Sequence, residues 1–155
     1  MIVTGDVMNY VKRSSCGVSI SCRGDKQNLQ IGIKAYINKL CQVRLASYDG
    51  IIKVTKNIFH FQRLIPIYAQ KDILLFPLSS IRNMDVLYIN YLEIYKINRD
   101  KNNNISIMFY DHTTLNVKIS TVFLSKQMKR CERIIQFLNK KSQESVYNYG
   151  LSLEI

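Results

Sequence analysis

The residues with the clearest chemical potential form a basic stripe in the last quarter of the sequence. Between residues 123 and 143, lysines and arginines recur at a spacing that places them on one side of a helix, with Phe137 among them and only Glu132 as an acidic neighbour. These cations are Lys126, Lys129, Arg130, Arg133, Lys140 and Lys141. Because such side chains bind phosphate groups, the stripe is a candidate anion-binding surface, and the alternative is a helix face that is only solvated.

Residues of the types used in catalysis and metal binding are few and scattered. The cysteines form no Cys-x-x-Cys pair and have no histidines at ligand spacing, and they are Cys16, Cys22, Cys41 and Cys131. No catalytic signature surrounds His60 or His112, and the glycines are too dispersed for a phosphate-binding loop. We therefore expect a protein with reduced thiols that is not an enzyme and uses neither a metal nor a cofactor.

The net charge of the whole chain, like the basic stripe, favours an anionic partner. Its 155 residues include 22 lysines and arginines against 11 aspartates and glutamates, a formal net charge of +11. This balance favours a polyanionic partner, either nucleic acid or an acidic membrane surface, over charge that serves only solubility. The length is that of one domain, and the sequence shows neither a membrane-spanning apolar run nor a signal peptide. We expect a soluble cytoplasmic protein.

Alternation of apolar and polar residues predicts mostly β-strands between residues 16 and 119. The predicted strands are residues 16–22, 29–37, 51–55, 73–76, 86–97, 105–110 and 114–119. The last three are joined by the short polar links 98–104 and 111–113, so they are expected to form an antiparallel meander.

One amphipathic helix is predicted for residues 123–143. Its apolar residues, among them Leu124, Cys131 and Ile134, gather opposite the basic stripe, and either Ser120 or Thr121 can cap its amino terminus. Residues 145–155 have no clear period and are expected to form a flexible end or an added strand. The predicted fold class is α+β, with an antiparallel β-sheet or a half-open barrel packed against one carboxy-terminal amphipathic helix.

Several short motifs follow one another along the middle of the sequence. They are Ile37-Asn38-Lys39-Leu40-Cys41, Ser47-Tyr48-Asp49-Gly50, Ile65-Pro66-Ile67, Phe76-Pro77-Leu78-Ser79-Ser80 and Tyr88-Ile89. Their order resembles that of the ComK family of bacterial competence transcription factors. The similarity covers about residues 31–138, and residues 1–25 and 145–155 match poorly. Because Leu45 stands where the family pattern usually has Gly, and Tyr88 where it has Trp, the chain resembles a divergent, short member that forms a single domain over residues 1–155.

Most of the matched residues are expected to serve the fold and not to bind a ligand. We expect Gly50 to occupy a turn with positive φ, and Pro66 and Pro77 to fix the ends or edges of strands, because proline cannot donate a ladder hydrogen bond. The remaining three are expected to be packing residues: Cys41, Tyr48 and Tyr88.

The resemblance implies a transcription activator that binds double-stranded DNA at A·T-rich boxes, mainly through the minor groove and the phosphates. It also implies a homo-dimer or tetramer, and an adaptor protein that directs proteolysis. Basic residues near the family-like turns extend the candidate DNA-binding set: Lys53, Lys56, Arg63 and Arg82. The alternative is an adaptor module of the pleckstrin-homology kind that binds a protein or an acidic lipid, because short antiparallel strands followed by one helix also fit that architecture.

Overall fold

The described residues form a six-stranded antiparallel sheet, a three-stranded antiparallel sheet and three α-helices. The computed structural model describes residues 7–102 and 104–153, and side chains as far as residue 144. In the larger sheet the strand order is β3-β2-β1-β6-β5-β4, and in the smaller sheet it is β7-β8-β9. The sheets do not close into a barrel, so the predicted α+β class is confirmed in its open-sheet form.

The element bounds are as follows. The strands are β1 (Met8–Ser14), β2 (Gly17–Cys22), β3 (Asp25–Leu29), β4 (Ile67–Gln70), β5 (Ile73–Pro77), β6 (Leu87–Asn90), β7 (Ile94–Arg99), β8 (Ile105–Phe109) and β9 (Thr114–Val117). The helices are α1 (Ile33–Gln42), α2 (Tyr48–Phe59), the short 3₁₀ turn η1 (Tyr91–Glu93) and α3 (Thr121–Leu153).

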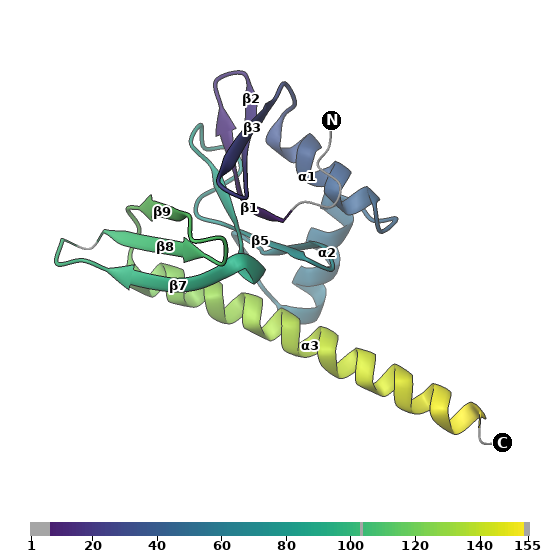
Figure 1. The fold of residues 1–155 in the computed structure, drawn as a ribbon. Helices are drawn as coiled ribbons and strands as arrows, with labels where there is room; N and C mark the ends of the chain where they lie inside the picture. Colours follow the sequence, from purple (N-terminus) through teal and green to yellow (C-terminus); the bar gives the residue numbers. More distant parts are fainter. Residues whose placement is uncertain (1–6, 103, 154–155) are drawn as a thin grey trace.

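The larger sheet separates two hydrophobic cores. Figure 1 shows α1 and α2 on one side of this sheet, and the β7–β9 sheet with α3 on the other. Successive residues of a strand point to opposite faces, so Leu75 and Tyr88 join the core under α1, whereas Phe76 and Ile89 join the core under α3. Strands β5 and β6 are therefore buried on both faces, and they hold the two halves of the molecule together.

Residues 29–37 do not form the predicted strand. Strand β3 ends at Leu29, and α1 begins at Ile33. The buried residues of α1 recur at helical spacing and are Ile33, Tyr36, Ile37, Leu40 and Cys41. This period of three and four places one continuous apolar stripe against the sheet, and it outweighs the shorter alternation that suggested a strand.

The predicted strand over residues 51–55 is also wrong, because these residues lie inside α2. Ser47 caps this helix by accepting a hydrogen bond from the Gly50 amide at 3.0 Å. Gly50 is therefore the third residue of a helix, and the expected turn with positive φ is a second error. At the other end, His60 adopts a left-handed φ of 61° and stops the helix, and Pro66 follows in an extended segment.

Residues 86–97 form two strands in different sheets where one long strand was predicted. The chain leaves the larger sheet at Asn90, turns through η1 and enters the smaller sheet as β7. The Asn90 side chain is fully buried, and its amide donates to the Met8 and Asp72 carbonyls at 2.8 and 3.0 Å. Its oxygen accepts from the Leu74 amide at 3.1 Å, so this one side chain ties the corner to three other segments.

The predicted meander and the predicted carboxy-terminal helix are confirmed. Strands β7, β8 and β9 pair in sequence order, and α3 covers them. Ser120 is the cap, since its hydroxyl accepts from the Phe123 amide at 3.0 Å. The helix continues to Leu153, which contradicts an added strand for residues 145–153, and residues 154–155 lie outside the described residues. Strand β1 was not predicted, although it lies at the centre of the larger sheet.

The packing roles expected for the matched residues are largely confirmed. Cys41 and Tyr88 are buried, and Pro77 ends β5 while Pro66 directly precedes β4. Burial, followed by a hydrogen bond with Tyr48, raises the pKa of Tyr88 well above its usual range. Tyr48 is half-buried and packs against the core under α1.

Candidate nucleic-acid interface

The end of α2 and the beginning of α3 enclose a groove of about 760 Å³ that is rich in cations. The end of α2 contributes Phe59, and the segment after it contributes His60 and Phe61. The first turns of α3 contribute four of the six residues of the predicted basic stripe, which are Lys126, Lys129, Arg130 and Arg133. The structure therefore places the front of the stripe along a concave surface. We call this surface the basic groove.

Two stacked phenylalanines form a shelf beneath the arginines of the basic groove. The rings of Phe59 and Phe61 lie 5.3 Å apart with an interplanar angle of 14°. The Arg133 guanidinium lies over both rings, at 5.6 and 5.2 Å from their centroids, and that of Arg130 lies 4.7 Å from the Phe61 centroid. Such cation–π contacts restrict the guanidinium without neutralising it, so less entropy is lost when it binds an anion.

Arg130 differs from its neighbours because it is tied into the fold. Its guanidinium donates to the Arg63 carbonyl at 2.7 Å and lies 3.4 Å from the Gln127 side-chain oxygen. Burial, and then the nearby charge of Arg133, lowers its pKa, although a guanidinium stays charged at neutral pH. Arg130 thus fixes the loop after α2 against α3, and its ability to reach a ligand is limited.

The other three cations of the basic groove are available to a ligand. Lys126, Lys129 and Arg133 are exposed, and within the described side chains no carboxylate lies within 4.0 Å of them. A desolvated phosphate entering the groove would thus meet positive charge that no internal partner has already neutralised.

The remaining predicted DNA-binding residues lie outside the basic groove. Lys140 and Lys141 follow further along α3, where Lys141 pairs with Glu144 at 3.4 Å. Lys53 and Lys56 are exposed on α2, about two turns and one turn before His60 respectively. Arg63 and Arg82 are exposed in loops, after α2 and before β6 respectively.

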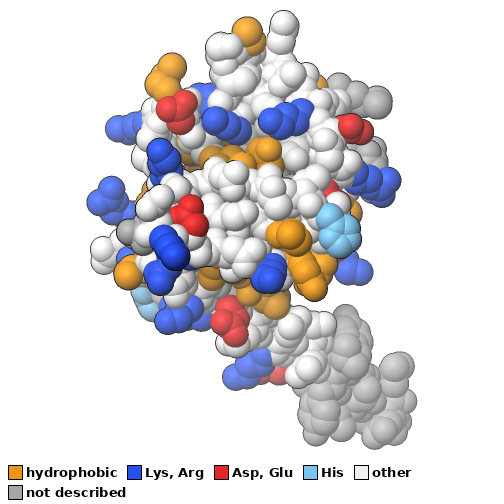
Figure 2. Space-filling model, turned by 60° about the vertical axis from the view of Figure 1, so that its left-hand side comes forward, with side chains coloured by type: hydrophobic (Ala, Val, Ile, Leu, Met, Phe, Trp, Pro, Cys, Tyr) orange, Lys and Arg blue, Asp and Glu red, His pale blue; other side chains and the backbone are white. Residues whose placement is uncertain are grey.

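Basic residues also populate the rest of the surface. Figure 2 shows Lys and Arg side chains spread over the visible face, with fewer Asp and Glu between them.

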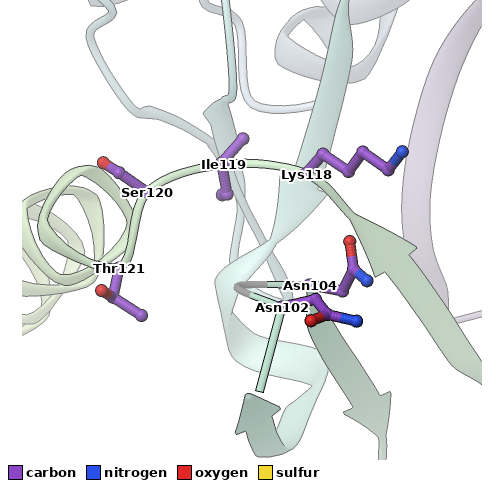
Figure 3. Close-up of a pocket in the computed structure, with 6 residues that line it drawn as sticks. All are labelled: Asn102, Asn104, Lys118, Ile119, Ser120 and Thr121. Carbon is purple, nitrogen blue, oxygen red and sulfur yellow. The ribbon is translucent and has the colours of Figure 1, made fainter. Parts of the chain in front are cut away.

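A second hollow, of about 520 Å³, lies between the β7–β8 turn and the segment that leads into α3. Figure 3 shows Asn102 and Asn104 on one side of this hollow and Ser120 and Thr121 on the other. Lys118 adds a positive charge there, but the hollow holds no dense cation cluster like that of the basic groove.

Sequence reasoning did not identify His60 or the two phenylalanines as parts of this surface. The Phe-x-Phe pair is visible in the sequence, but its position opposite α3 depends on where α2 ends. That end is set by the left-handed backbone at His60, a conformation that the sequence alone does not reveal.

The comparison with protein families decides what kind of protein carries this groove. The family model described as ComK protein matches residues 10–143. The chain belongs to the ComK family. The family is one of competence-type transcription factors, as the sequence motifs predicted, and the match is longer than the predicted 31–138. It includes most of β1 and all of β2, which the motifs had left unmatched.

The other comparisons add no relative to this family assignment. No curated protein and no solved structure gave a significant match to the chain. Within the described residues, none of the helices has both the length and the hydropathy of a membrane span.

Proposed function

We propose that this ComK-family chain activates transcription by binding double-stranded DNA through the basic groove, and that it does so in the cytoplasm as a homo-dimer or tetramer. The observation that carries the proposal is a set of three exposed cations beside an aromatic shelf, which have no carboxylate partner among the described side chains: Lys126, Lys129 and Arg133. Nothing observed in the described structure favours the pleckstrin-homology alternative, so it is not carried further.

Each group of the basic groove has a distinct part in this proposal. Lys126 and Lys129 contact phosphates as mobile point charges, whereas Arg133 is held on the shelf and presents a planar fork of donors. Phosphate contacts supply most of the affinity because each releases condensed counterions from the duplex. Arg130 acts as a positioning residue for the loop after α2.

Preference for A·T-rich boxes follows from the shape and charge of the DNA. A·T-rich minor grooves are narrow and strongly negative, so they attract arginine and lysine even though their edges offer few base-specific features. The outlying cations Lys53, Lys56, Lys140 and Lys141 extend contact to flanking phosphates in this proposal. Arg63 and Arg82 lie at the edge of this proposed contact surface. Two or four linked copies would then add weak contacts at neighbouring boxes through effective concentration.

The test is the salt dependence of DNA binding in a double variant. Replacing Lys129 and Arg133 with alanine should weaken binding and reduce the slope of log affinity against log salt by roughly two, since each phosphate contact contributes a little under one. Fluorescence anisotropy with an A·T-rich and a mixed-sequence duplex measures both quantities. If the two cations lie in the minor groove, the A·T-rich duplex should lose more affinity than the mixed one.

A matched control separates the basic groove from net charge. Lys26 and Lys71 are exposed lysines outside the groove, and replacing both with alanine removes the same total charge. This control should keep nearly the wild-type slope. Equal slopes for the wild type and the Lys129→Ala, Arg133→Ala variant would remove the groove from the DNA interface.

A further inference from the structure

The four cations that line the basic groove differ in how firmly the fold holds their charged ends. Among the described side chains, Lys126 and Lys129 have no cation–π contact, hydrogen bond or ion pair. Arg130 is fixed, but its guanidinium is already occupied by the Arg63 carbonyl at 2.7 Å. Arg133 lies on the aromatic shelf, and in the described part of the chain its guanidinium has no hydrogen-bonding partner. Arg133 is therefore fixed in position and still has its donors available.

The shelf beneath Arg133 is itself held from two directions. Phe61 is only 6% exposed and belongs to the core under α3. Phe59 stacks on Phe61, and the ring of Phe137 meets Phe59 edge-on, with centroids 5.4 Å apart and an interplanar angle of 74°. Because the shelf is packed into the fold in this way, a guanidinium that rests on it loses little further freedom when it binds.

We infer that Arg133 determines the preference for A·T-rich DNA, and that the phenylalanine shelf positions it for this role. Selectivity between sequences requires donors whose direction the protein fixes, whereas affinity for phosphates requires only positive charge within reach. Lys126 and Lys129 meet the second requirement alone, and Arg133 meets both. This inference rests on the proposed function and assigns its sequence preference to one residue.

The chemistry of a guanidinium suits the narrow groove of A·T-rich DNA. This groove is strongly negative, and arginine enters it at a lower dehydration cost than lysine because its charge is spread over a planar, weakly hydrated group. The planar fork of N–H donors can also reach the acceptor atoms that adenine and thymine expose on the groove floor. A lysine at position 133 would keep the charge, but it would lose the planar fork and the fixed direction.

Charge-conserving substitutions test this assignment because they leave the net charge of the groove unchanged. Fluorescence anisotropy on an A·T-rich and a mixed-sequence duplex of equal length gives the ratio of the two affinities, which measures the preference. Arg133→Lys should lower this ratio roughly 5-fold or more, the value of one well-placed bidentate contact, and leave the salt slope on the mixed duplex unchanged. Lys129→Arg is the matched control, and it should keep both the ratio and the slope of the wild type.

Phe59→Leu tests the positioning role of the shelf without changing any charge. Leucine keeps an apolar side chain at this half-buried site but removes the ring under the Arg133 guanidinium. It should lower the ratio while the salt slope stays unchanged, which a general loss of charge would not do. The double variant with Arg133→Lys should lower the ratio no further than Arg133→Lys alone, because both changes remove the same interaction. Thermal melting of each variant measures whether its fold is retained.

The outcomes separate this inference from the proposed function. A wild-type ratio in Arg133→Lys overturns the inference, even where the wild type prefers A·T-rich DNA as proposed. An equal loss of the ratio in Lys129→Arg also overturns it, because the preference would then be spread over the groove. A wild type that binds no DNA, or binds both duplexes equally, contradicts the proposed function itself and removes this inference with it.

Discussion

Replacement of Gln127 by leucine tests whether one buried amide joins three parts of the fold. Gln127 lies on α3 and is completely buried against the loop after α2 and the end of β5. Its side-chain nitrogen donates to the Leu64 carbonyl in the loop after α2 and to the Pro77 carbonyl at the end of β5, both at 2.9 Å. Its oxygen lies 3.4 Å from the Arg130 guanidinium.

The cost of Gln127→Leu follows from the groups left behind. Two carbonyls lose a donor inside the protein, at about 1–3 kcal/mol each when no other donor replaces it. Burial of the leucine side chain returns about 1.5–2 kcal/mol. The Leu64 carbonyl also keeps a long contact with Arg130 at 3.5 Å, which moderates its loss. We therefore expect a net destabilisation of about 2 kcal/mol, near the middle of these bounds.

Urea unfolding and thermal melting measure this loss. For a chain of this size, 2 kcal/mol corresponds to a fall in Tm of roughly 4–8 °C. Gln136→Leu is the control, since Gln136 is exposed on the same helix and should change stability by less than about 0.5 kcal/mol. A Gln127→Leu variant as stable as this control would refute the bridging role of the buried amide.

Two further predictions concern side chains that join the layers. Tyr88→Ala should cost about 3–5 kcal/mol in urea unfolding, because Tyr88 lies on β6 and is buried in the core under α1. Replacing the half-buried Tyr48 with alanine should cost less. A Tyr88→Ala protein with unchanged Tm and lost DNA binding would instead make Tyr88 a ligand contact. Burial opposes the charged form of Asp111, but hydrogen bonds from Thr113 and from Asn9, at 2.7 Å, outweigh it and lower its pKa. The stability from Asp111, about 1 kcal/mol at this exposed position, is full above the unfolded-state pKa near 4 and is lost as the pH falls through the lower folded pKa. Urea unfolding of Asp111→Asn should thus differ from the wild type at pH 7, and the difference should shrink as the pH falls through the folded pKa of Asp111; a difference that stays constant into acid would contradict the assignment.

The elements that could be predicted from the sequence were those with an uninterrupted local pattern. The strands β8 and β9 alternate cleanly, and α3 has both an apolar stripe and a capping serine at residue 120. The family could also be predicted, because the order of several motifs is informative even where each single motif is weak. These signals need no knowledge of distant contacts.

The errors arose where short apolar runs fit two periods. In α1, Ile33 and Ile37 satisfy both a strand alternation and a helix stripe, and only burial of Tyr36 and Leu40 against the sheet decides between them. The break at Asn90 depends on partners in β1 and β5, which are 82 and 16 residues away. Tertiary hydrogen bonds of this kind leave no local trace in the sequence.

For the candidate site, the sequence supplied the cations but not the surface they share. The helical spacing of Lys126, Lys129 and Arg133 was readable, and the structure places all three along one groove. Their aromatic shelf comes from a segment more than 60 residues earlier in the chain, because Phe61 packs under α3. The sequence pattern could not separate the front of the stripe from Lys140 and Lys141, which lie outside that groove.

The central claim is that the chain binds A·T-rich double-stranded DNA, and its most direct test is selection of genomic DNA fragments by the purified full-length protein at two salt concentrations. The account predicts enrichment of fragments with paired A·T-rich boxes at both concentrations, with total recovery falling steeply as salt rises. Recovery of DNA without any enrichment, or of no DNA at the lower salt concentration, would contradict it.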